Sequence, residues 1–202
     1  MLTLLIIVCI VVTSIFAFNN RSFYIKGWFS PYDIKRFKQY YRFITHIFLH
    51  VSWEHLLFNM ITLYFFGTFV EQGFSYYFGK LGNVLFLFEF VAAGVLASLP
   101  TYVKNRNNSS YVAVGASGAV SAILFSSILL DPTNKIFILF IPIGIPAYVF
   151  GPLYLIYCVY MARKNVDQVA HDVHFWGAII GFLLPILFMP ELLSIFVQQI
   201  FG

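Results

Sequence analysis

The stretch Gly115-Ala116-Ser117-Gly118-Ala119 lies where a polar loop leads into an apolar segment, 115–130. A segment of this kind is expected to enter a bilayer, so Ser117 should lie a little below the membrane surface. His174 holds the matching place at the start of a later apolar segment. Crossing a bilayer requires neither group, and polar or ionisable residues inside a membrane are candidates for function. This serine and this histidine are therefore the first candidates for a functional site.

The composition is that of a membrane protein. Of the 202 residues, 60% are hydrophobic and only 10% are charged, whereas soluble domains are usually about 45–50% apolar and about 25% charged. A spanning helix needs about 20 apolar residues. We therefore predict an all-α, polytopic membrane helix bundle with six transmembrane helices. It should form a single membrane domain over 1–202, with the six-span core in about 1–190.

Six apolar segments are candidates for the spans. Their approximate limits are 2–18, 53–71, 79–100, 115–130, 136–161 and 173–189. Pro100 should end the third span, and prolines and glycines should kink or break the fifth. The basic and aromatic segment 19–52 should form an interfacial element in the headgroup plane. Ser30 and Ser52 have the positions of helix N-caps.

Four polar side chains should share one depth on one side of the bundle. Spans two, four and six begin on the same side of the membrane, and each has a candidate in its first turns. His55 and Asn59 stand in span two, Ser117 in span four and His174 in span six. Hydropathy does not require this coincidence, whereas a site assembled from three helices would produce it.

These residue types suit acyl transfer through an activated serine. The Ser117 hydroxyl becomes nucleophilic when a neutral imidazole such as His174 takes its proton. Attack on an amide creates an oxyanion, which needs hydrogen-bond donors. The Ser117 N–H at a helix start, the Asn59 amide and the His55 ring N–H could supply them. Asp172 is two residues from His174 and therefore on another helix face, which favours a Ser–His dyad without a carboxylate.

Small residues would let the two helices meet. Gly177 and Gly181 form a GxxxG face on span six, and small residues within 115–121 lie on span four. Faces of this kind allow close helix approach in membranes. The side chains of Ser117 and His174 could then come together.

Five motifs follow one another along the chain. They are Arg42-x-x-x-His46-x-x-x-His50, His50-x-x-x-x-His55-x-x-x-Asn59, Gly67-x-x-x-Glu71, Gly115-x-Ser117-Gly118 and His174-x-x-Gly177-x-x-x-Gly181. Over residues 40–185 they resemble the rhomboid family of intramembrane serine proteases. The resemblance implies Ser117 as nucleophile and His174 as general base. It also implies His55, Asn59 and Gly115 at the oxyanion and substrate-binding site, with the Ser117 N–H as a further donor.

The same resemblance implies cleavage of peptide bonds in or near transmembrane segments of other membrane proteins, with no metal and no organic cofactor. The partners would be transmembrane substrates and the lipid bilayer. Segment 19–52 would correspond to the family's membrane-embedded first loop, and span five to its proposed lateral gate. Many members have a tyrosine one turn after the nucleophile, where this chain has Ser121. Phe175 or Trp176 could hold the His174 ring instead, or the ring could be held less rigidly.

Other functions are less well supported by the residues. The net charge of +4 flanks the apolar spans, which is typical of contact with lipid headgroups rather than nucleic acid. A channel or transporter would need polar groups through the whole bilayer, whereas here they stop near one face. A catalytically silent rhomboid-like factor that binds or escorts membrane proteins is the main alternative. Such factors usually lack the serine or the histidine, and this chain has both.

Several polar residues have structural interpretations. His46 and His50 have the i, i+4 spacing of zinc ligands, but the HExxH order is absent. We expect them, with Arg42, to order the loop and line a wet cavity. Glu71 should be a hydrogen-bond acceptor within the bundle. Cys9 and Cys158 should be buried apolar residues without a disulfide.

Family topology predicts an integral protein of a bacterial inner membrane, with the active face away from the cytosol. The charges oppose this orientation, because only Lys80 and Lys135 would then be inside and the other ten Lys and Arg residues outside. Oligomeric state, substrate and pathway are not predicted by the sequence.

Overall fold

The computed structural model describes residues 1–137, 143–164 and 169–202, and most of its regular structure is helical. The longer helices are α1 (Leu2–Asn19), α5 (Trp53–Phe78), α6 (Gly82–Asn105), α7 (Ser117–Leu130), α8 (Ala147–Lys164), α9 (His171–Phe188) and α10 (Glu191–Phe201). Between α1 and α5 lie the short helices α2 (Arg21–Gly27), α3 (Pro31–Phe37), α4 (Arg42–Thr45) and η1 (His46–Phe48). The turn η2 (Gly79–Leu81) joins α5 to α6.

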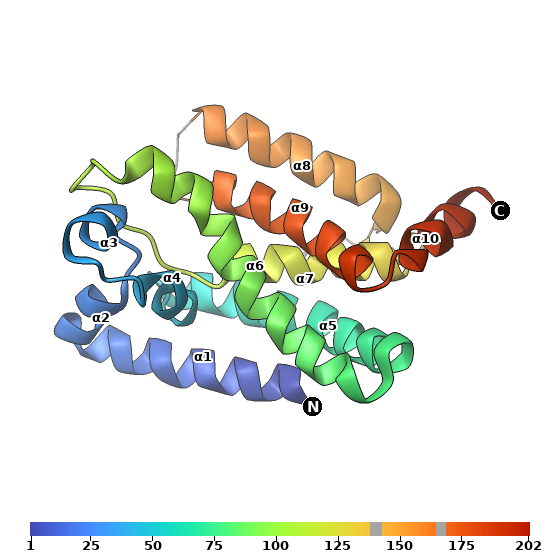
Figure 1. The fold of residues 1–202 in the computed structure, drawn as a ribbon, viewed down its shortest axis with the longest axis horizontal. Coiled ribbons are helices and arrows are strands. Elements are labelled where there is room, and N and C mark those ends of the chain that lie inside the picture. The colour runs from blue at the N-terminus through green and yellow to red at the C-terminus, as the bar shows by residue number, and fades with distance from the viewer. Residues whose placement is uncertain (138–142, 165–168) are drawn as a thin grey trace.

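The long helices from α1 to α9 alternate in direction. In Figure 1, α5, α7 and α9 begin at one end of the bundle, whereas α1, α6 and α8 begin at the other. The candidate residues of α5, α7 and α9 therefore lie at one common end, as the parity of the apolar segments predicts. The short helices α2, α3 and α4 gather at that same end (Figure 1).

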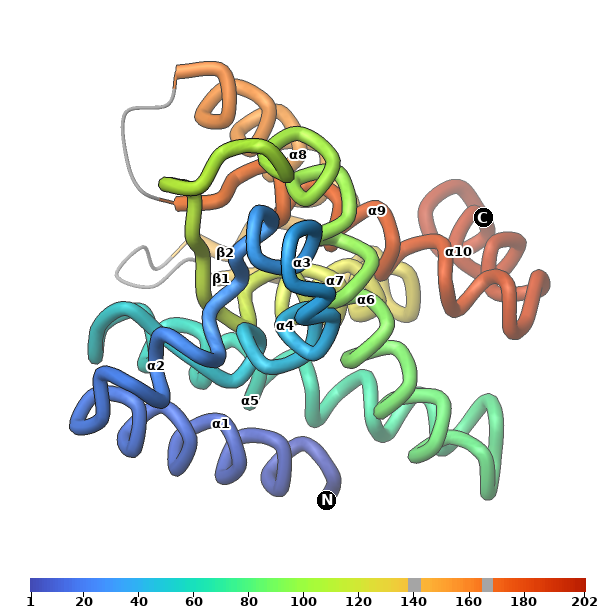
Figure 2. Tube along the Cα trace, turned by 60° about the vertical axis from the view of Figure 1, so that its left-hand side comes forward, coloured from blue at the N-terminus to red at the C-terminus, as the bar shows by residue number. Residues whose placement is uncertain are grey.

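Helix α7 is the centre of the bundle, and Figure 2 shows it enclosed by the other helices. Every residue from Gly118 to Leu130 is buried. With 14 residues α7 is about 21 Å long at 1.5 Å per residue, shorter than a hydrocarbon core of about 30 Å. A helix surrounded by protein does not have to match the bilayer, because its ends meet protein groups instead of lipid.

Helices α7 and α9 run parallel and meet backbone to backbone. A Cβ atom at Gly177 would overlap the Gly118 carbonyl oxygen, and one at Gly181 would overlap that of Ala122. The two contacts advance by one turn on both helices, so the register is kept along the seam. The GxxxG packing expected from the sequence is confirmed.

Polar contacts fix α1 to α5 and order the helix starts. Glu71 accepts hydrogen bonds from the Leu2 N–H (2.6 Å), the Thr3 N–H (2.9 Å) and the Thr3 hydroxyl (2.6 Å). The carboxylate thereby satisfies N–H groups that the first turn of a helix leaves without partners, and the expected acceptor role of Glu71 is confirmed. Ser30 and Ser52 cap α3 and α5 as predicted, accepting from Asp33 N and His55 N.

The structure corrects the predicted limits of spans three and five. The described residues before α8 do not form the start of a helix: β1 (Lys135–Phe137) pairs antiparallel with β2 (Gly144–Pro146), and α8 starts only at Ala147. Pro142 lies outside the described residues. Helix α8 continues through Pro152, and α6 continues through Pro100 to Asn105. Membrane helices tolerate an internal proline because neighbouring groups satisfy the freed carbonyl.

Within the described part of the chain, three continuous helical stretches are long and apolar enough to cross a membrane: Leu2–Asn19, Trp53–Asn105 and His171–Phe188. The second contains both α5 and α6. By this criterion α7 and α10 are apolar but short, so the count of six spans stays a prediction. Cys158 is buried as expected, whereas Cys9 is exposed on α1, and both are free thiols.

Candidate active site

Gly115 brings the α5 and α7 candidates together. Its φ of +138° belongs to a region that side chains rarely adopt. A Cβ there would lie 2.8 Å from His55 Cε1 and 3.1 Å from His55 Nε2, so the imidazole covers this glycine. The Ser117 hydroxyl oxygen is 3.6 Å from the same point. His55 and Ser117 therefore face one small volume beside Gly115.

The loop before α7 is held by the short helices. The Gly115 N–H donates to the His46 carbonyl oxygen at 3.0 Å, so in this structure that N–H is occupied. Phe29 and Ala113 exchange two backbone hydrogen bonds of 2.8 and 3.0 Å. Ser117, the first residue of α7, has an N–H without an intrahelical acceptor. The helix N-terminus thus presents a donor where negative charge is favoured.

Asn59 lies one turn after His55 on α5. It is buried, and its side-chain N–H donates to the His55 carbonyl oxygen at 2.9 Å. His55 is only partly buried, although its Nδ1 is buried and has no hydrogen-bond partner in the part of the chain that the structure describes. The two candidate oxyanion donors therefore share one face of α5, with the amide deeper than the imidazole.

The close contact between α7 and α9 determines how far along the bundle His174 lies relative to Ser117. Gly177 abuts Gly118, and the Val173 side chain is close enough that a Cβ on Gly118 would lie 2.8 Å from it. His174 precedes Gly177 by three residues and shares its helix face, which brings it to the level of the Gly115–Ser117 turn. Ser117 and His174 are both partly exposed, so both can be reached from outside the bundle.

Among the described residues, the aromatic ring beside His174 is not one of the two that we expected. The ring meets His171, one turn earlier, edge to face with centroids 5.8 Å apart. Phe175 and Trp176 instead pair with each other. The reason is helical geometry: residues i and i+3 lie on the same face, whereas i+1 and i+2 do not. His171 in turn contacts Tyr157 of α8 at 5.6 Å between centroids.

Asp172 is committed to another contact. It accepts a hydrogen bond from the Thr101 hydroxyl of α6 at 2.7 Å and from the Val173 N–H at 3.0 Å. This carboxylate therefore joins α9 to α6 on a face away from His174.

Arg42 orders the loop, as the sequence predicts. Its guanidinium donates to the Ile25 and Trp28 carbonyl oxygens at 2.9 and 2.8 Å and to Gln39 at 2.6 Å. It also lies 3.5 Å from Asp33. One buried side chain thereby joins α2, α3 and α4.

Two buried histidines of the loop are held neutral. Burial lowers the pKa of His46 from 6.5 to about 4, and burial together with the nearby His55 lowers the pKa of His50 to about 3. His50 Nδ1 is 2.9 Å from the Ser14 hydroxyl of α1. The Nε2 atoms of both histidines are buried, and neither has a hydrogen-bond partner within the described ranges. In the described part of the chain, no three His, Cys, Asp or Glu residues are grouped to hold a metal ion.

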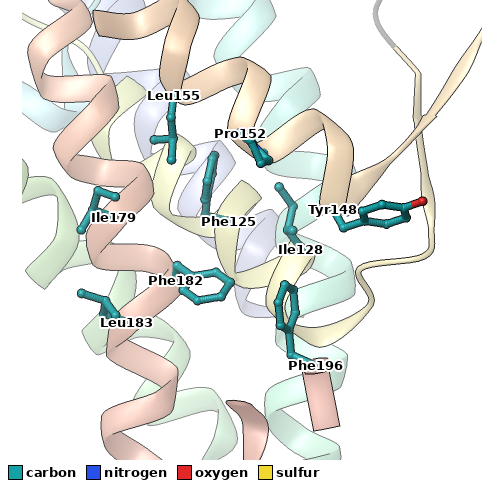
Figure 3. A pocket seen from close by; sticks show the side chains of 10 residues that line it. Phe125, Ile128, Tyr148, Pro152, Leu155, Ile179, Phe182, Leu183 and Phe196 are labelled. Carbon is teal, nitrogen blue, oxygen red and sulfur yellow. The ribbon is translucent and has the colours of Figure 1, made fainter. Parts of the chain in front are cut away.

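On the other side of α7, contact with α8 is looser. Ser121, one turn after Ser117, shares a 2.7 Å hydrogen bond with the Tyr154 hydroxyl. Further along lies a cavity of about 290 Å³ between α7, α8, α9 and α10. Figure 3 shows apolar side chains of all four helices around it, including Phe125, Leu155 and Phe182. This cavity begins two turns beyond Ser117, so it is separate from the candidate site.

Comparison with known proteins identifies the family. The profile of the Rhomboid domain matches residues 38–191, and the chain therefore belongs to the rhomboid family. With its apolar helices it is an integral membrane protein built as a helical bundle.

Individual relatives come from plants and bacteria. RHOMBOID-like protein 12, mitochondrial, of Arabidopsis thaliana is 27% identical over 172 residues, which are 80% of this chain and 50% of that protein. Rhomboid-like protein 11, chloroplastic, of the same plant is 34% identical over 110 residues, which are 54% of this chain and 36% of that protein. The putative rhomboid protease YdcA of Bacillus subtilis is 35% identical over 82 residues, which are 41% of this chain and 37% of that protein. The chain spans half or less of the length of each.

Sequence reasoning missed three residues around the site and one acid deeper in the bundle. Ser14, Tyr154 and His171 have no local pattern that distinguishes them from other polar residues of apolar helices. Glu89 did have a signal, because an acid in the middle of an apolar span is itself a candidate for function. It is fully buried in α6.

Proposed function

We propose that this protein is an intramembrane serine endopeptidase that cleaves peptide bonds in or near transmembrane segments of other membrane proteins. The observation that carries the proposal is the Gly115 turn, where His55 and the Ser117 hydroxyl face one volume at the start of α7. Membership of the rhomboid family supports the same activity. Two of the relatives found in Bacillus subtilis are named rhomboid proteases.

In the proposed mechanism Ser117 is the nucleophile and His174 the general base. His174 takes the hydroxyl proton as the serine oxygen attacks the substrate carbonyl carbon. The resulting oxyanion accepts hydrogen bonds from the Ser117 N–H and from the side chains of His55 and Asn59. His174 then gives its proton to the leaving amine, and a water molecule hydrolyses the acyl-enzyme by the same route. Gly115 leaves room for the substrate because any side chain there would meet His55.

The proposed topology has six spans, formed by α1, α5, α6, α7, α8 and α9, with the active end away from the cytosol of a bacterial cell. The alternating directions of these helices support this arrangement (Figure 1). A reporter fused after Gly202 tests the orientation. Activity of a cytosolic reporter at this end agrees with the proposal, whereas activity of an external reporter reverses it.

The activity is tested with purified protein and a generic transmembrane substrate in detergent and in liposomes. The parent protein should cleave it, and Ser117→Ala and His174→Ala should each lower the rate by at least about 10³-fold. Ser127→Ala is the matched control, because Ser127 is on the same helix but bonds to the Leu124 carbonyl oxygen. Equal rates in all four proteins would refute the assigned roles.

A fluorophosphonate probe separates the enzyme from a catalytically silent binding factor. The parent and Ser127→Ala should be labelled, and Ser117→Ala should not. Absence of labelling in every protein, with intact substrate binding, would favour the binding factor.

A further inference from the structure

Glu89 is an acid in the core of the bundle with no cation to balance it. It is fully buried in α6, and the one ion pair within the described ranges is Arg42–Asp33 in the loop. Helix α7, which packs against it, has no ionisable side chain, and those of α9 are all in its first turn: His171, Asp172 and His174. Glu71 of α5 is engaged by α1. An ionised carboxylate here would have no compensating charge, which is very costly in a medium of low dielectric.

The contacts of the Ser126 hydroxyl indicate whether the Glu89 carboxyl group carries a proton. The Ser126 oxygen is in hydrogen-bond contact with Glu89 Oε1 and lies 2.7 Å from the Gly181 carbonyl oxygen and 3.1 Å from that of Ala122. A hydroxyl has a single hydrogen. Were Glu89 ionised, that hydrogen would go to the carboxylate, and the 2.7 Å contact with Gly181 would join two oxygens without a hydrogen. A protonated Glu89 supplies the missing one.

We propose that Glu89 is a neutral carboxylic acid that donates to Ser126, which in turn donates to the Gly181 carbonyl oxygen. This hydrogen-bond chain joins α6, α7 and α9 at a single point. The second carboxyl oxygen, Oε2, has no hydrogen-bond partner among the described residues, which is far less costly for the carbonyl oxygen of a neutral acid than for half of an ion.

The hydrogen-bond chain from Glu89 through Ser126 to Gly181 also affects the proposed catalytic groups. It ends at Gly181, where α9 meets the Ala122 backbone, one turn beyond the contact of Gly177 with Gly118. Fixing that register fixes His174 relative to Ser117. Glu89 is therefore a positioning residue, a role that rests on the function proposed above, whereas its protonation does not.

Infrared spectroscopy tests the protonation directly. Purified parent and Glu89→Gln proteins are compared at pH 7 in a detergent without ester groups, in H₂O and in D₂O. The difference spectrum should contain the carbonyl band of a protonated carboxylic acid, lost in the Gln variant and shifted in D₂O. Loss of carboxylate bands instead would mean that Glu89 is ionised, and would overturn the proposal. This readout does not depend on proteolysis.

Stability and rate test the hydrogen-bond chain. Glu89→Gln keeps a donor for Ser126, so its unfolding midpoint should stay within about 3 °C of the parent and its cleavage rate within about threefold. Glu89→Leu has the bulk but no donor, and should lower the midpoint by about 5 °C or more and kcat by about tenfold with little change in KM. Glu191→Leu, in α10, is the matched control and should match the parent. A large rise in the midpoint of Glu89→Gln, or equal behaviour of the Gln and Leu variants, would contradict the chain.

Discussion

The two sides of α7 are packed in opposite ways. Toward α9, glycines bring backbone against backbone, with no room for an added methyl group at Gly177 or Gly181. Toward α8 there is a cavity of about 290 Å³, and among the described residues one side-chain hydrogen bond, between Ser121 and Tyr154, joins the two helices. The tight side carries the proposed base, and the loose side carries none of the proposed catalytic groups. The proposed catalytic groups must be held in position to within fractions of an ångström. They thus lie away from the α8 side of α7, where looser packing allows movement.

Gly181→Ala should break the tight side and have the largest effect. The new Cβ would overlap the Ala122 backbone, which cannot move aside as a flexible side chain could. We expect a loss of about 3 kcal/mol or more in unfolding free energy and loss of cleavage. Thermal unfolding in detergent micelles measures the first, and a variant as stable as the parent would mean that the seam is not close-packed.

Acid should have the next largest effect, because it lowers the stability of the fold through the loop histidines. His46, whose carbonyl oxygen holds Gly115, and His50 have folded-state pKa values of about 4 and about 3, against 6.5 for a free imidazole. Between those values the unfolded chain binds more protons, so stability is full above about pH 6.5 and falls as the pH is lowered. The slope is at most about 1.4 kcal/mol per pH unit for each histidine. Unfolding midpoints at pH 7 and pH 5 measure it.

His50→Gln is the control for this titration. It removes one titrating group, so the difference between the two midpoints should shrink relative to the parent. An unchanged pH dependence would show that other groups are responsible.

Tyr154→Phe should weaken the loose side by a smaller amount. It deletes the 2.7 Å hydrogen bond to Ser121 and keeps the ring, so we expect a loss of about 1 kcal/mol. Combining it with Ser121→Ala should cost less than the sum of the single changes, because both remove the same bond. Strict additivity in the double-mutant cycle would mean that the bond contributes nothing.

Gly151→Ala should have the smallest effect, with the opposite sign to Gly181→Ala. Its Cβ would lie 3.5 Å from Ile128 and 3.6 Å from Phe125, which is ordinary contact at the edge of the cavity. Replacing a helical glycine by alanine gains up to about 1 kcal/mol. The variant should be as stable as the parent or slightly more stable, and a marked loss would show that the α8 side is as tight as the α9 side.

Hydropathy and motif spacing predict much of this molecule. They locate all six long segments that became α1, α5, α6, α7, α8 and α9, because apolar length is a local property. They fail at Lys135–Phe137 and Gly144–Pro146, which pair as two short strands instead of starting a helix, since periodicity does not separate short apolar strands from helices. They also fail at Pro100, because whether a helix passes through a proline depends on its neighbours.

The candidate site was predictable only in part, for a physical reason. Motifs named Ser117, His174, His55 and Asn59, whose spacing along the chain is visible. The ring beside His174 and the partner of Ser121 come from contacts between helices, or between turns of one helix, that no motif contains. Tyr154 reaches Ser121 across an interface between two helices.

Parallel packing of α7 and α9 also has a consequence for biosynthesis. Two parallel helices need a third between them, and His174 is therefore made about 57 residues after Ser117, roughly 3–11 s later at the usual pace of translation. Until then the nascent chain contains the serine without the proposed base and without the glycines that fix its partner helix. The proposed protease is thus inert beside the newly inserted proteins around it, and its proposed catalytic pair is completed only when α9 enters the bilayer.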